Sequence, residues 1–270
     1  MERLPALQTQ GLWAGYSARP VLCDVALSIP AGEVVGVIGP NGSGKSTLVR
    51  VLSGVLAPQR GAARLYGRDI ATLGAGDVAR RLAVVPQTPV LPESFYVYQM
   101  VLLGRTPHLG FLGREGVRDH AIARRAMEMT ATLALANRRI SDLSGGERQR
   151  VVVARALAQE PDVVLMDEPT SHLDIGYQTA VLEMVMDLVR ERGLTVLVVF
   201  HDLNLAAQYC QRILLLSEGR LLADGPPEDV LTSELISRVY GGQTVVTAHP
   251  TNGAPVVLPV RERAEASRGG

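Results

Sequence analysis

The chain has 270 residues, with 27 basic and 27 acidic side chains and therefore no formal net charge. This balance argues against a polybasic surface for nucleic acid or anionic lipid, so no nucleic-acid partner is expected. The length allows one large domain, or one domain with a subdomain. Neither a signal peptide nor a run of about 18 apolar residues is found, so any membrane role is expected to come through a partner.

The first forty residues have the pattern of β-strands. Strands are predicted at residues 12–16 and 21–29, with a turn between them. Tyr16 ends the first strand, and Arg19 follows closely. The Tyr16 ring can stack on a nucleotide base, or it can be an ordinary residue at the end of a strand. Its chemistry alone leaves both interpretations open.

A loop matching G-x-x-x-x-G-K-[ST] lies between an apolar run at 34–38 and a helical pattern that begins at Leu48. Its residues are Gly39, Pro40, Asn41, Gly42, Ser43, Gly44, Lys45, Ser46 and Thr47. Such a loop turns backbone N–H groups inward at a helix N-terminus and so binds nucleotide phosphates. Lys45, the one lysine among the 27 basic residues, would supply a compact charge at the β- and γ-phosphates. Ser46 would supply a hydroxyl ligand for Mg²⁺.

The middle of the chain changes character. A strand is predicted at 82–85, ending at Pro86 and Gln87, and residues 88–159 then have a mainly helical pattern. We interpret this as a helical subdomain inserted in an α/β core. Residues 104–110 contain two glycines and a proline, so they are predicted to form an exposed connector. His108 within it is interpreted as a surface residue rather than a metal ligand.

Two further groups of polar residues follow predicted structural elements. Ser144, Gly145 and Gly146 begin a predicted helix, where they can bind an anion or form a flexible cap. Asp167 ends a buried strand at 163–167, which places it to hold Mg²⁺ through water.

Glu168, next in the chain, can polarise the water that attacks a γ-phosphate. His201 ends a strand predicted at 195–200. It is placed to sense the γ-phosphate, although a solvent-exposed histidine at a strand end is the alternative.

Taken in this order, these segments resemble the nucleotide-binding subunit of ABC transporters over about residues 8–230. The matches are Tyr16 for the base-stacking aromatic residue, residues 39–47 for Walker A, Gln87 for the Q-loop, residues 143–147 for the signature, residues 163–167 for Walker B, Glu168 for the catalytic glutamate, residues 171–174 for the D-loop and His201 for the switch histidine.

The resemblance implies an α/β fold: a P-loop NTPase core with an antiparallel β subdomain and an inserted α-helical subdomain. It implies ATP and Mg²⁺, with Ser46, Gln87 and Asp167 at the metal, Asp174 at the nucleotide, and Glu168, His201 and Gln87 in hydrolysis. Two copies are expected to face head to tail, each ATP lying between the Walker motifs of one and Ser144 to Gly146 of the other.

A narrower resemblance concerns residues 102–110, His172 and residues 239–259, which are similar to the ATPases of iron-siderophore, haem and cobalamin importers. It implies a separate integral membrane permease, an extracytoplasmic substrate-binding protein, and a peripheral position at the cytoplasmic face of the membrane. Residues 96–100 are more polar and aromatic than this pattern, and Glu147 replaces the commoner Gln. The expected organisation is an ATPase domain at 1–245, with the helical insertion at about 88–159, and a C-terminal extension with a polar tail at 246–270.

The sequence leaves two alternatives open. One is the ATPase of an ABC exporter, which can also be a separate chain. The other is a soluble ABC protein of translation, repair or chromosome architecture. The latter usually has two cassettes or a long coiled coil, and often basic surfaces, whereas this chain has one cassette and no net charge. We further hypothesise that Gln87 and the connector from Arg105 to Gly110 transmit closure to the permease.

Overall fold

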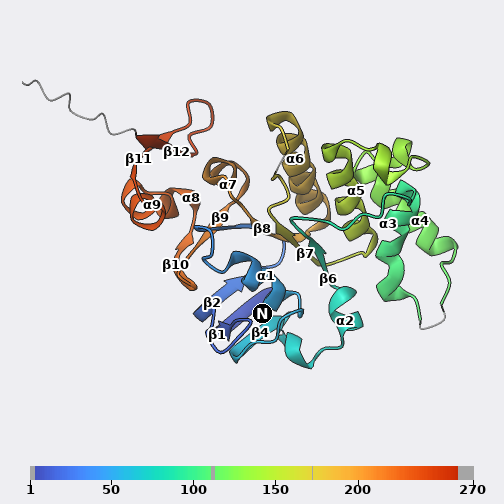
Figure 1. The fold of residues 1–270 in the computed structure, drawn as a ribbon, viewed down its shortest axis with the longest axis horizontal. Coiled ribbons are helices and arrows are strands. Elements are labelled where there is room, and N and C mark those ends of the chain that lie inside the picture. The colour runs from blue at the N-terminus through green and yellow to red at the C-terminus, as the bar shows by residue number, and fades with distance from the viewer. Residues whose placement is uncertain (1–3, 111–112, 172, 261–270) are drawn as a thin grey trace, which may run out of the picture.

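The computed structural model describes residues 4–110, 113–171 and 173–260 (Figure 1). His172 and the tail after residue 260, both of which entered the sequence predictions, lie outside the described residues. Within the described part, no helix combines the length and the apolar character that crossing a membrane requires.

A six-stranded sheet forms the centre of the molecule. Its order is β10 (Arg220–Gly225), β9 (Arg212–Ser217), β3 (Val34–Ile38), β8 (Thr195–Val199), β7 (Val163–Asp167) and β6 (Leu82–Val85). All neighbours are parallel except β10, which pairs antiparallel with β9 at the edge. β3, β7 and β8 are almost continuous apolar runs, as parallel strands covered on both faces require.

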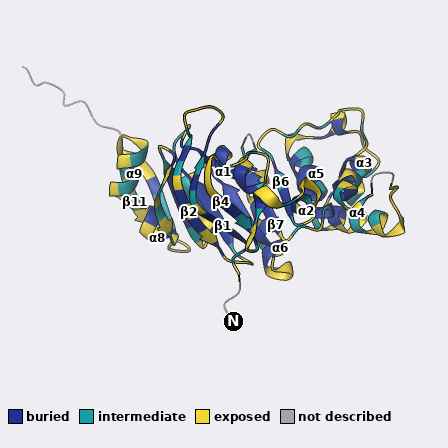
Figure 2. Cartoon of the chain, turned by 90° about the horizontal axis from the view of Figure 1, so that it is seen from below, coloured by how far each residue is buried: buried dark blue, intermediate teal, exposed yellow. Residues whose placement is uncertain are grey.

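An antiparallel sheet covers one side of this centre. Its order is β2 (Leu22–Ile29), β1 (Leu7–Ala14), β4 (Arg60–Leu65) and β5 (Arg68–Asp69). The phosphate-loop helix α1 (Lys45–Leu52) contacts β1, β4 and β7, so it is packed between the two sheets. Successive residues of β3 belong to two different hydrophobic clusters. Val35 and Val37 pack with this layer, whereas Val34 and Ile38 pack with the helices on the opposite face. Figure 2 shows the buried strands inside an exposed outer layer.

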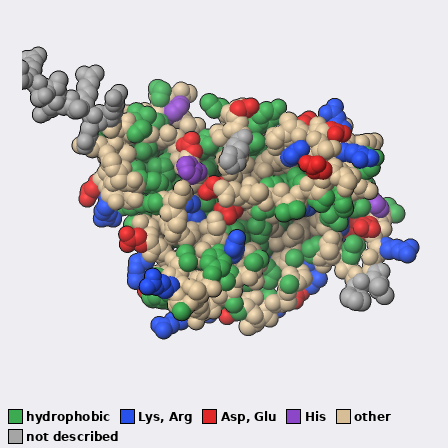
Figure 3. All heavy atoms as spheres, in the orientation of Figure 1, with side chains coloured by type: hydrophobic (Ala, Val, Ile, Leu, Met, Phe, Trp, Pro, Cys, Tyr) green, Lys and Arg blue, Asp and Glu red, His purple; other side chains and the backbone are tan. Residues whose placement is uncertain are grey.

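Helices occupy the two ends of the molecule (Figure 1). One end contains α3 (Val97–Leu102), the 3-10 segment η2 (Leu103–His108), α4 (Val117–Met129) and α5 (Gly145–Ala158), with short 3-10 turns at Leu133–Leu135 and Ile140–Asp142. The remaining helices are α2 (Ala75–Ala79), which follows the 3-10 turn Ile70–Thr72, then α6 (Ile175–Arg192), α7 (Leu203–Tyr209), α8 (Pro227–Val230) and α9 (Ser233–Tyr240). The α/β fold class is confirmed. On the face in Figure 3, basic and acidic side chains are interspersed.

The first strand differs from the prediction. It spans Leu7–Ala14 rather than residues 12–16, and Tyr16 lies beyond its end. The sequence pattern hid this strand because Thr9 and two glutamines interrupt its apolar residues. Thr9 is nevertheless buried, since its hydroxyl donates to the backbone oxygen of Val25 at 2.9 Å and accepts from the N–H of Leu27. A satisfied polar group can occupy a core position.

The prediction of an exposed connector at 104–110 is wrong at its start. Arg105 has only 3% of its side chain exposed, because its guanidinium pairs with Asp119 at 2.9 Å and with Glu160 at 3.0 Å. It also donates to the backbone oxygen of Ala158 at 2.7 Å. His108 is exposed, as expected. The carboxylates that make burial of Arg105 tolerable are distant in sequence, so the local pattern could not reveal them.

Gly104 is buried because η2 lies directly on the last turn of α5. A Cβ atom at this position would lie 2.2 Å from the backbone oxygen of Arg155 and 2.9 Å from the Cβ of Ala158. We expect Gly104→Ala to lower the free energy of unfolding by about 1–3 kcal/mol, as other overpacked sites do. Urea unfolding measures this. Gly110→Ala is the control, since a Cβ there meets nothing within 4 Å, and equal losses in both variants would contradict the close packing.

The C-terminal extension contains structure that the sequence pattern did not predict. β11 (Gln243–Ala248) and β12 (Pro255–Val260) form a hairpin, which is fixed to α7 by Asn204. The Asn204 side chain accepts from the Val257 N–H at 2.8 Å and donates to the Val257 oxygen at 3.4 Å. The domain boundary at residue 245 stays a prediction, and β11 spans it.

Candidate functional site

The carboxyl ends of four neighbouring parallel strands bring the sequence-predicted residues to one edge of the sheet. A cavity of about 380 Å³ lies there. Its lining consists of Val21, Asn41, Gly42, Gly44, Lys45, Ser46, Thr47, Gln87, Glu168 and His201. Residues that are up to 180 positions apart in the chain therefore share one cavity, and most of them carry polar groups.

The phosphate loop needs glycine at its two ends. Gly39 has φ 153°, and a Cβ there would lie 2.1 Å from the backbone oxygen of Leu216. Gly44 has φ 106°, and its Cβ would lie 2.6 Å from a methyl group of Leu22. Backbone conformations of this kind and contacts this close exclude larger residues. α1 begins immediately after Gly44, and its first three residues line the cavity, so the helix N-terminus lies where a phosphate site requires it.

Lys45 is held inside this loop. Its side chain is only 7% exposed, and Nζ donates to the backbone oxygens of Gly39 at 2.7 Å and Pro40 at 3.0 Å. Burial lowers the pKa of the Lys45 ammonium, while the carboxylates of Glu168 and Asp167 act in the opposite direction. The ammonium thus lies among backbone dipoles at the place where negative phosphate oxygens would compensate its burial.

Ser46 and Asp167 meet across the gap between α1 and β7. The Ser46 hydroxyl donates to Asp167 Oδ1 at 3.3 Å. Burial raises the pKa of Asp167 above its ordinary value, against the opposing effects of the Ser46 hydrogen bond and the charges of Lys45 and Arg50. A hydroxyl and a carboxylate are the oxygen ligands that Mg²⁺ prefers, so these side chains fit the expected metal.

Asp167→Asn is expected to separate stability from activity. A carboxylate whose folded-state pKa is raised costs stability when it is ionised, and this cost disappears as the pH falls through the raised pKa. The variant should therefore unfold at higher urea concentration than the native chain at about pH 7, and this gain should shrink as the pH is lowered through the acidic range in which the carboxyl becomes protonated. Mg²⁺-dependent hydrolysis should be lost. A gain in stability that does not change as the pH is lowered until the carboxyl is protonated would contradict this account.

Glu168 occupies a strained backbone position beside Asp167. Its φ is 49°, in the left-handed region that residues other than glycine seldom adopt. Its N–H donates to the Val199 oxygen at 3.1 Å, and its carbonyl accepts from the hydroxyl of Ser171 at 2.6 Å. The Glu168 carboxylate accepts from Nε2 of Gln87 at 2.6 Å, and both side chains line the cavity. These contacts hold the Glu168 carboxylate at the cavity, where it can accept a proton.

Tyr16 lies beside the far end of the phosphate loop and has 58% of its surface exposed. Its hydroxyl is 3.5 Å from that of Thr47 and accepts from Arg50 at 3.0 Å, and the Arg50 guanidinium lies 5.4 Å from the ring centre. Sequence reasoning named Arg19 as the neighbour and missed Arg50. The helical spacing after the loop was the available signal, since Arg50 is on α1.

Ser144, Gly145 and Gly146 do not line the cavity of their own chain. Ser144 caps α5: its hydroxyl accepts from the Glu147 N–H at 3.3 Å, and the Glu147 carboxylate accepts from the Ser144 N–H at 2.8 Å. These reciprocal hydrogen bonds lower the pKa of Glu147. They also show how Glu, in place of the commoner Gln, can take part in capping α5.

Gly146 lies against α6, since a Cβ there would be 2.4 Å from the Tyr177 ring. Asp174 caps α6 and is likewise absent from the cavity lining. The sequence allowed Ser144 either to bind an anion or to cap a helix. Within one chain, Ser144 caps the helix. Neither Asp174 nor the segment from Ser144 to Gly146 therefore contributes to this cavity within one chain.

Comparison with known proteins agrees with this arrangement. Residues 22–171 match the family model described as ABC transporter. The hemin import ATP-binding protein HmuV of Pseudomonas putida is 46% identical, over 93% of this chain and 99% of that protein. The ferric enterobactin transport ATP-binding protein FepC of Escherichia coli is 38% identical, over 96% of each.

A solved structure is similar along nearly the whole chain. It is described as an inward-facing conformation of a metal-chelate type ABC transporter, and it aligns with a TM-score of 0.84 and 28% identity over 96% of this chain and 98% of that chain. The family match includes the ends of β3, β6 and β7 at the cavity, whereas β8 and His201 lie beyond it.

Proposed function

Because the chain belongs to the ABC transporter family, as an ATP-binding subunit with ATPase activity, we propose that it hydrolyses ATP to drive uptake of a metal chelate through a separate permease. The observation that carries the proposal is the convergence of Lys45, Ser46 and Glu168 with Gln87 and His201 in one cavity. The related proteins named for hemin and ferric enterobactin support the cargo class of ferric siderophore, haem or cobalamin.

In the proposed reaction, Glu168 accepts a proton from water as that water attacks the γ-phosphorus and the bond to the bridging oxygen breaks. Gln87 positions the Glu168 carboxylate through the hydrogen bond between them. Lys45 offsets negative charge on the β- and γ-phosphates, and His201 holds the γ-phosphate. Ser46, Asp167 and Gln87 would hold Mg²⁺, which neutralises phosphate charge when bound.

A second copy of the chain completes the proposed site. The capped N-terminus of α5, with Ser144 to Gly146, lies outside the cavity of its own chain. In a head-to-tail pair, this segment of each copy would contact the ATP bound by the other, and Asp174 would lie near the same interface. Each ATP would then be enclosed by two chains, so release of γ-phosphate would open the pair.

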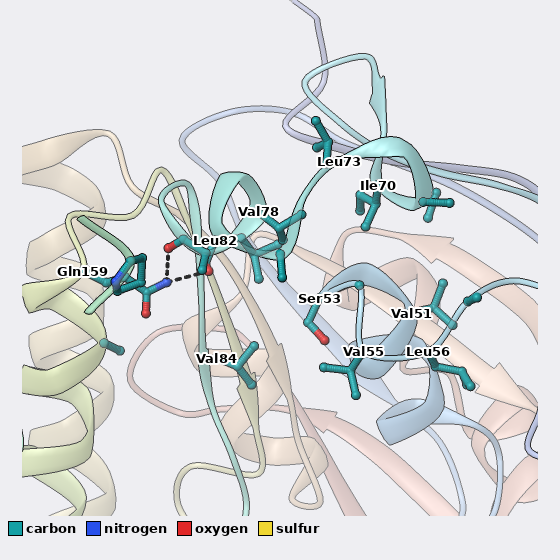
Figure 4. Close-up of a pocket in the computed structure, with 18 of the residues that line it drawn as sticks. Val51, Ser53, Val55, Leu56, Ile70, Leu73, Val78, Leu82, Val84 and Gln159 are labelled. Atoms are coloured by element: carbon teal, nitrogen blue, oxygen red, sulfur yellow. Dashed lines mark hydrogen bonds between the residues drawn. The ribbon is translucent and has the colours of Figure 1, made fainter. Parts of the chain in front are cut away.

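The permease is proposed to contact the larger cavity in Figure 4, of about 860 Å³, which lies between the α/β core and η2. Its wall is mainly apolar, and Val55 and Leu103 on opposite sides are 77% and 45% exposed. Exposed His108 lies at the end of η2 and is a better test of this contact than buried Arg105. The chain would thus lie at the cytoplasmic face of the membrane, with the extracytoplasmic binding protein reached through the permease.

Affinity purification from gently solubilised native membranes tests the proposal. The tagged chain should retain an integral protein with many membrane spans, and a chelate-binding protein should associate with that complex. Recovery of only soluble ribosomal, DNA-bound or metabolic partners would overturn the transport function and leave the ATPase activity unaffected.

A further inference from the structure

The cavity in Figure 4 has walls from two parts of the chain. One wall comes from the core: the end of α1, α2 and β6. The other comes from η2 and the last turn of α5. Both belong to the group α3, η2, α4 and α5 at one end of the molecule, which we call the helical segment. Movement of the helical segment relative to the core would therefore change the width of this cavity.

Gln159 joins the two walls at one end of the cavity. It is the C-cap residue of α5, and its side-chain Nε2 donates to the backbone oxygens of Ala79 and Leu82, the latter at 2.8 Å. Ala79 ends α2 and Leu82 begins β6, so both acceptors belong to the core. Figure 4 shows both hydrogen bonds. A single carboxamide thus links the helical segment to two backbone groups of the core.

The same end of α5 is fixed to η2. The His108 ring nitrogen Nε2 is 2.8 Å from the backbone oxygen of Gln159, and Arg105 donates to the backbone oxygen of Ala158 at 2.7 Å. Gly104 brings the η2 backbone against Arg155. η2 and the C-terminal end of α5 therefore form one packed unit, and a displacement of η2 must displace α5.

We propose that Gln159 is the pivot that couples the width of this cavity to the position of Ser144 to Gly146 at the opposite end of α5. The 14 residues of α5 span about 21 Å, so rotation at its C-terminus moves its N-terminus most. Arg80 also spans the gap, donating to the Pro107 oxygen at 3.2 Å, but both partners are solvent-accessible and this contact is weaker. The inference deepens the proposed function, because Ser144 to Gly146 is the segment proposed to reach the ATP of the second copy.

Variants at Gln159 distinguish the effect of its two hydrogen bonds from the effect of its size. Gln159→Met keeps the size of the side chain but removes its donor. Gln159→Glu keeps the shape but places a carboxylate against two carbonyl oxygens, and Gln159→Lys restores a donor. Gln10→Met is the matched control, since Gln10 is exposed and bonds Arg64 at 2.8 Å within one sheet. Each isolated variant should bind ATP within about twofold of the native affinity, which shows that it is folded.

Pulsed EPR measures the separation of the two parts. One spin label is attached at Thr72→Cys on the core side, and the other at Glu128→Cys on α4. The native cysteines are removed by Cys23→Ser and Cys210→Ala. The parent chain and Gln10→Met should give one narrow distance distribution. Gln159→Met should broaden it, Gln159→Glu should broaden it further, and Gln159→Lys should narrow it again. A Gln159→Met distribution equal to that of the parent would overturn the pivot.

Hydrolysis by the purified permease complex tests the coupling. Stimulation by the permease should fall about tenfold in Gln159→Glu, which corresponds to about 1.4 kcal/mol of coupling, and Gln159→Lys should recover it. Unchanged stimulation would overturn the coupling. If purification recovers only soluble partners and no permease, the proposed function fails, and the distance measurement on the isolated chain still decides whether Gln159 is a pivot.

Discussion

Replacing Glu168 by Gln is expected to slow ATP hydrolysis by about two to four orders of magnitude while Mg-ATP binding persists. The carboxamide has nearly the same shape and can still bond to Gln87, but it cannot accept a proton from the attacking water. The backbone at Glu168, with φ 49°, is unchanged by this substitution. Because ATP remains bound and intact, two copies of the variant should stay together as a closed pair.

Phosphate release measures the first effect, and sedimentation in Mg-ATP measures the second. Glu183→Gln is a suitable control, since Glu183 accepts a hydrogen bond from Tyr209 on the exposed surface of α6. Native turnover in Glu168→Gln would mean that another group positions the water, and a monomer in Mg-ATP would contradict the proposed pairing.

Lys45→Ala is expected to lower the affinity for ATP by about 10- to 100-fold, since hydrogen bonds to charged groups contribute about 1.5–3 kcal/mol. The buried ammonium makes no compensating ion pair within hydrogen-bond distance among the described residues, only bonds to Gly39 and Pro40. Because burial lowers the pKa of Lys45, its charged form costs stability below that pKa. The variant should therefore bind ATP less tightly without unfolding more easily.

Titration with a fluorescent ATP analogue measures the affinity, and urea unfolding measures the stability. Lys45→Arg tests whether charge alone is sufficient for ATP affinity. It keeps the positive charge but places a larger, planar guanidinium where the Lys45 side chain is only 7% exposed. Arg124→Ala on the exposed surface of α4 serves as the control. ATP affinity of Lys45→Ala within threefold of native would refute the role of Lys45 at the phosphates.

The parts of the site that lie close together in sequence could be predicted from it. The phosphate loop combines turn glycines, one lysine and a helix start within nine residues, and Asp167 ends an apolar strand that Glu168 directly follows. Parallel strands then bring their ends to one edge, so the meeting of Lys45, Glu168 and His201 follows from the fold class.

Contacts that depend on distant residues could not be predicted. Arg105 had an exposed pattern because its partners Asp119 and Glu160 lie 14 and 55 positions away. The link from Gln159 to Ala79 joins residues 80 positions apart. The C-terminal hairpin was missed for the same reason, since its attachment through Asn204 depends on the packing of α7. Local patterns specify elements, whereas packing between elements determines which polar residues are buried.

The direction of ATP-driven transport tests the central proposal most directly. The chain and its co-purified permease, reconstituted in vesicles with Mg-ATP on the side of the ATPase and the binding protein on the other, should move a ferric siderophore, haem or cobalamin toward the ATP side. The same vesicles with Glu168→Gln should move none. Transport away from the ATP side would show an exporter, and transport that does not require ATP would contradict the account.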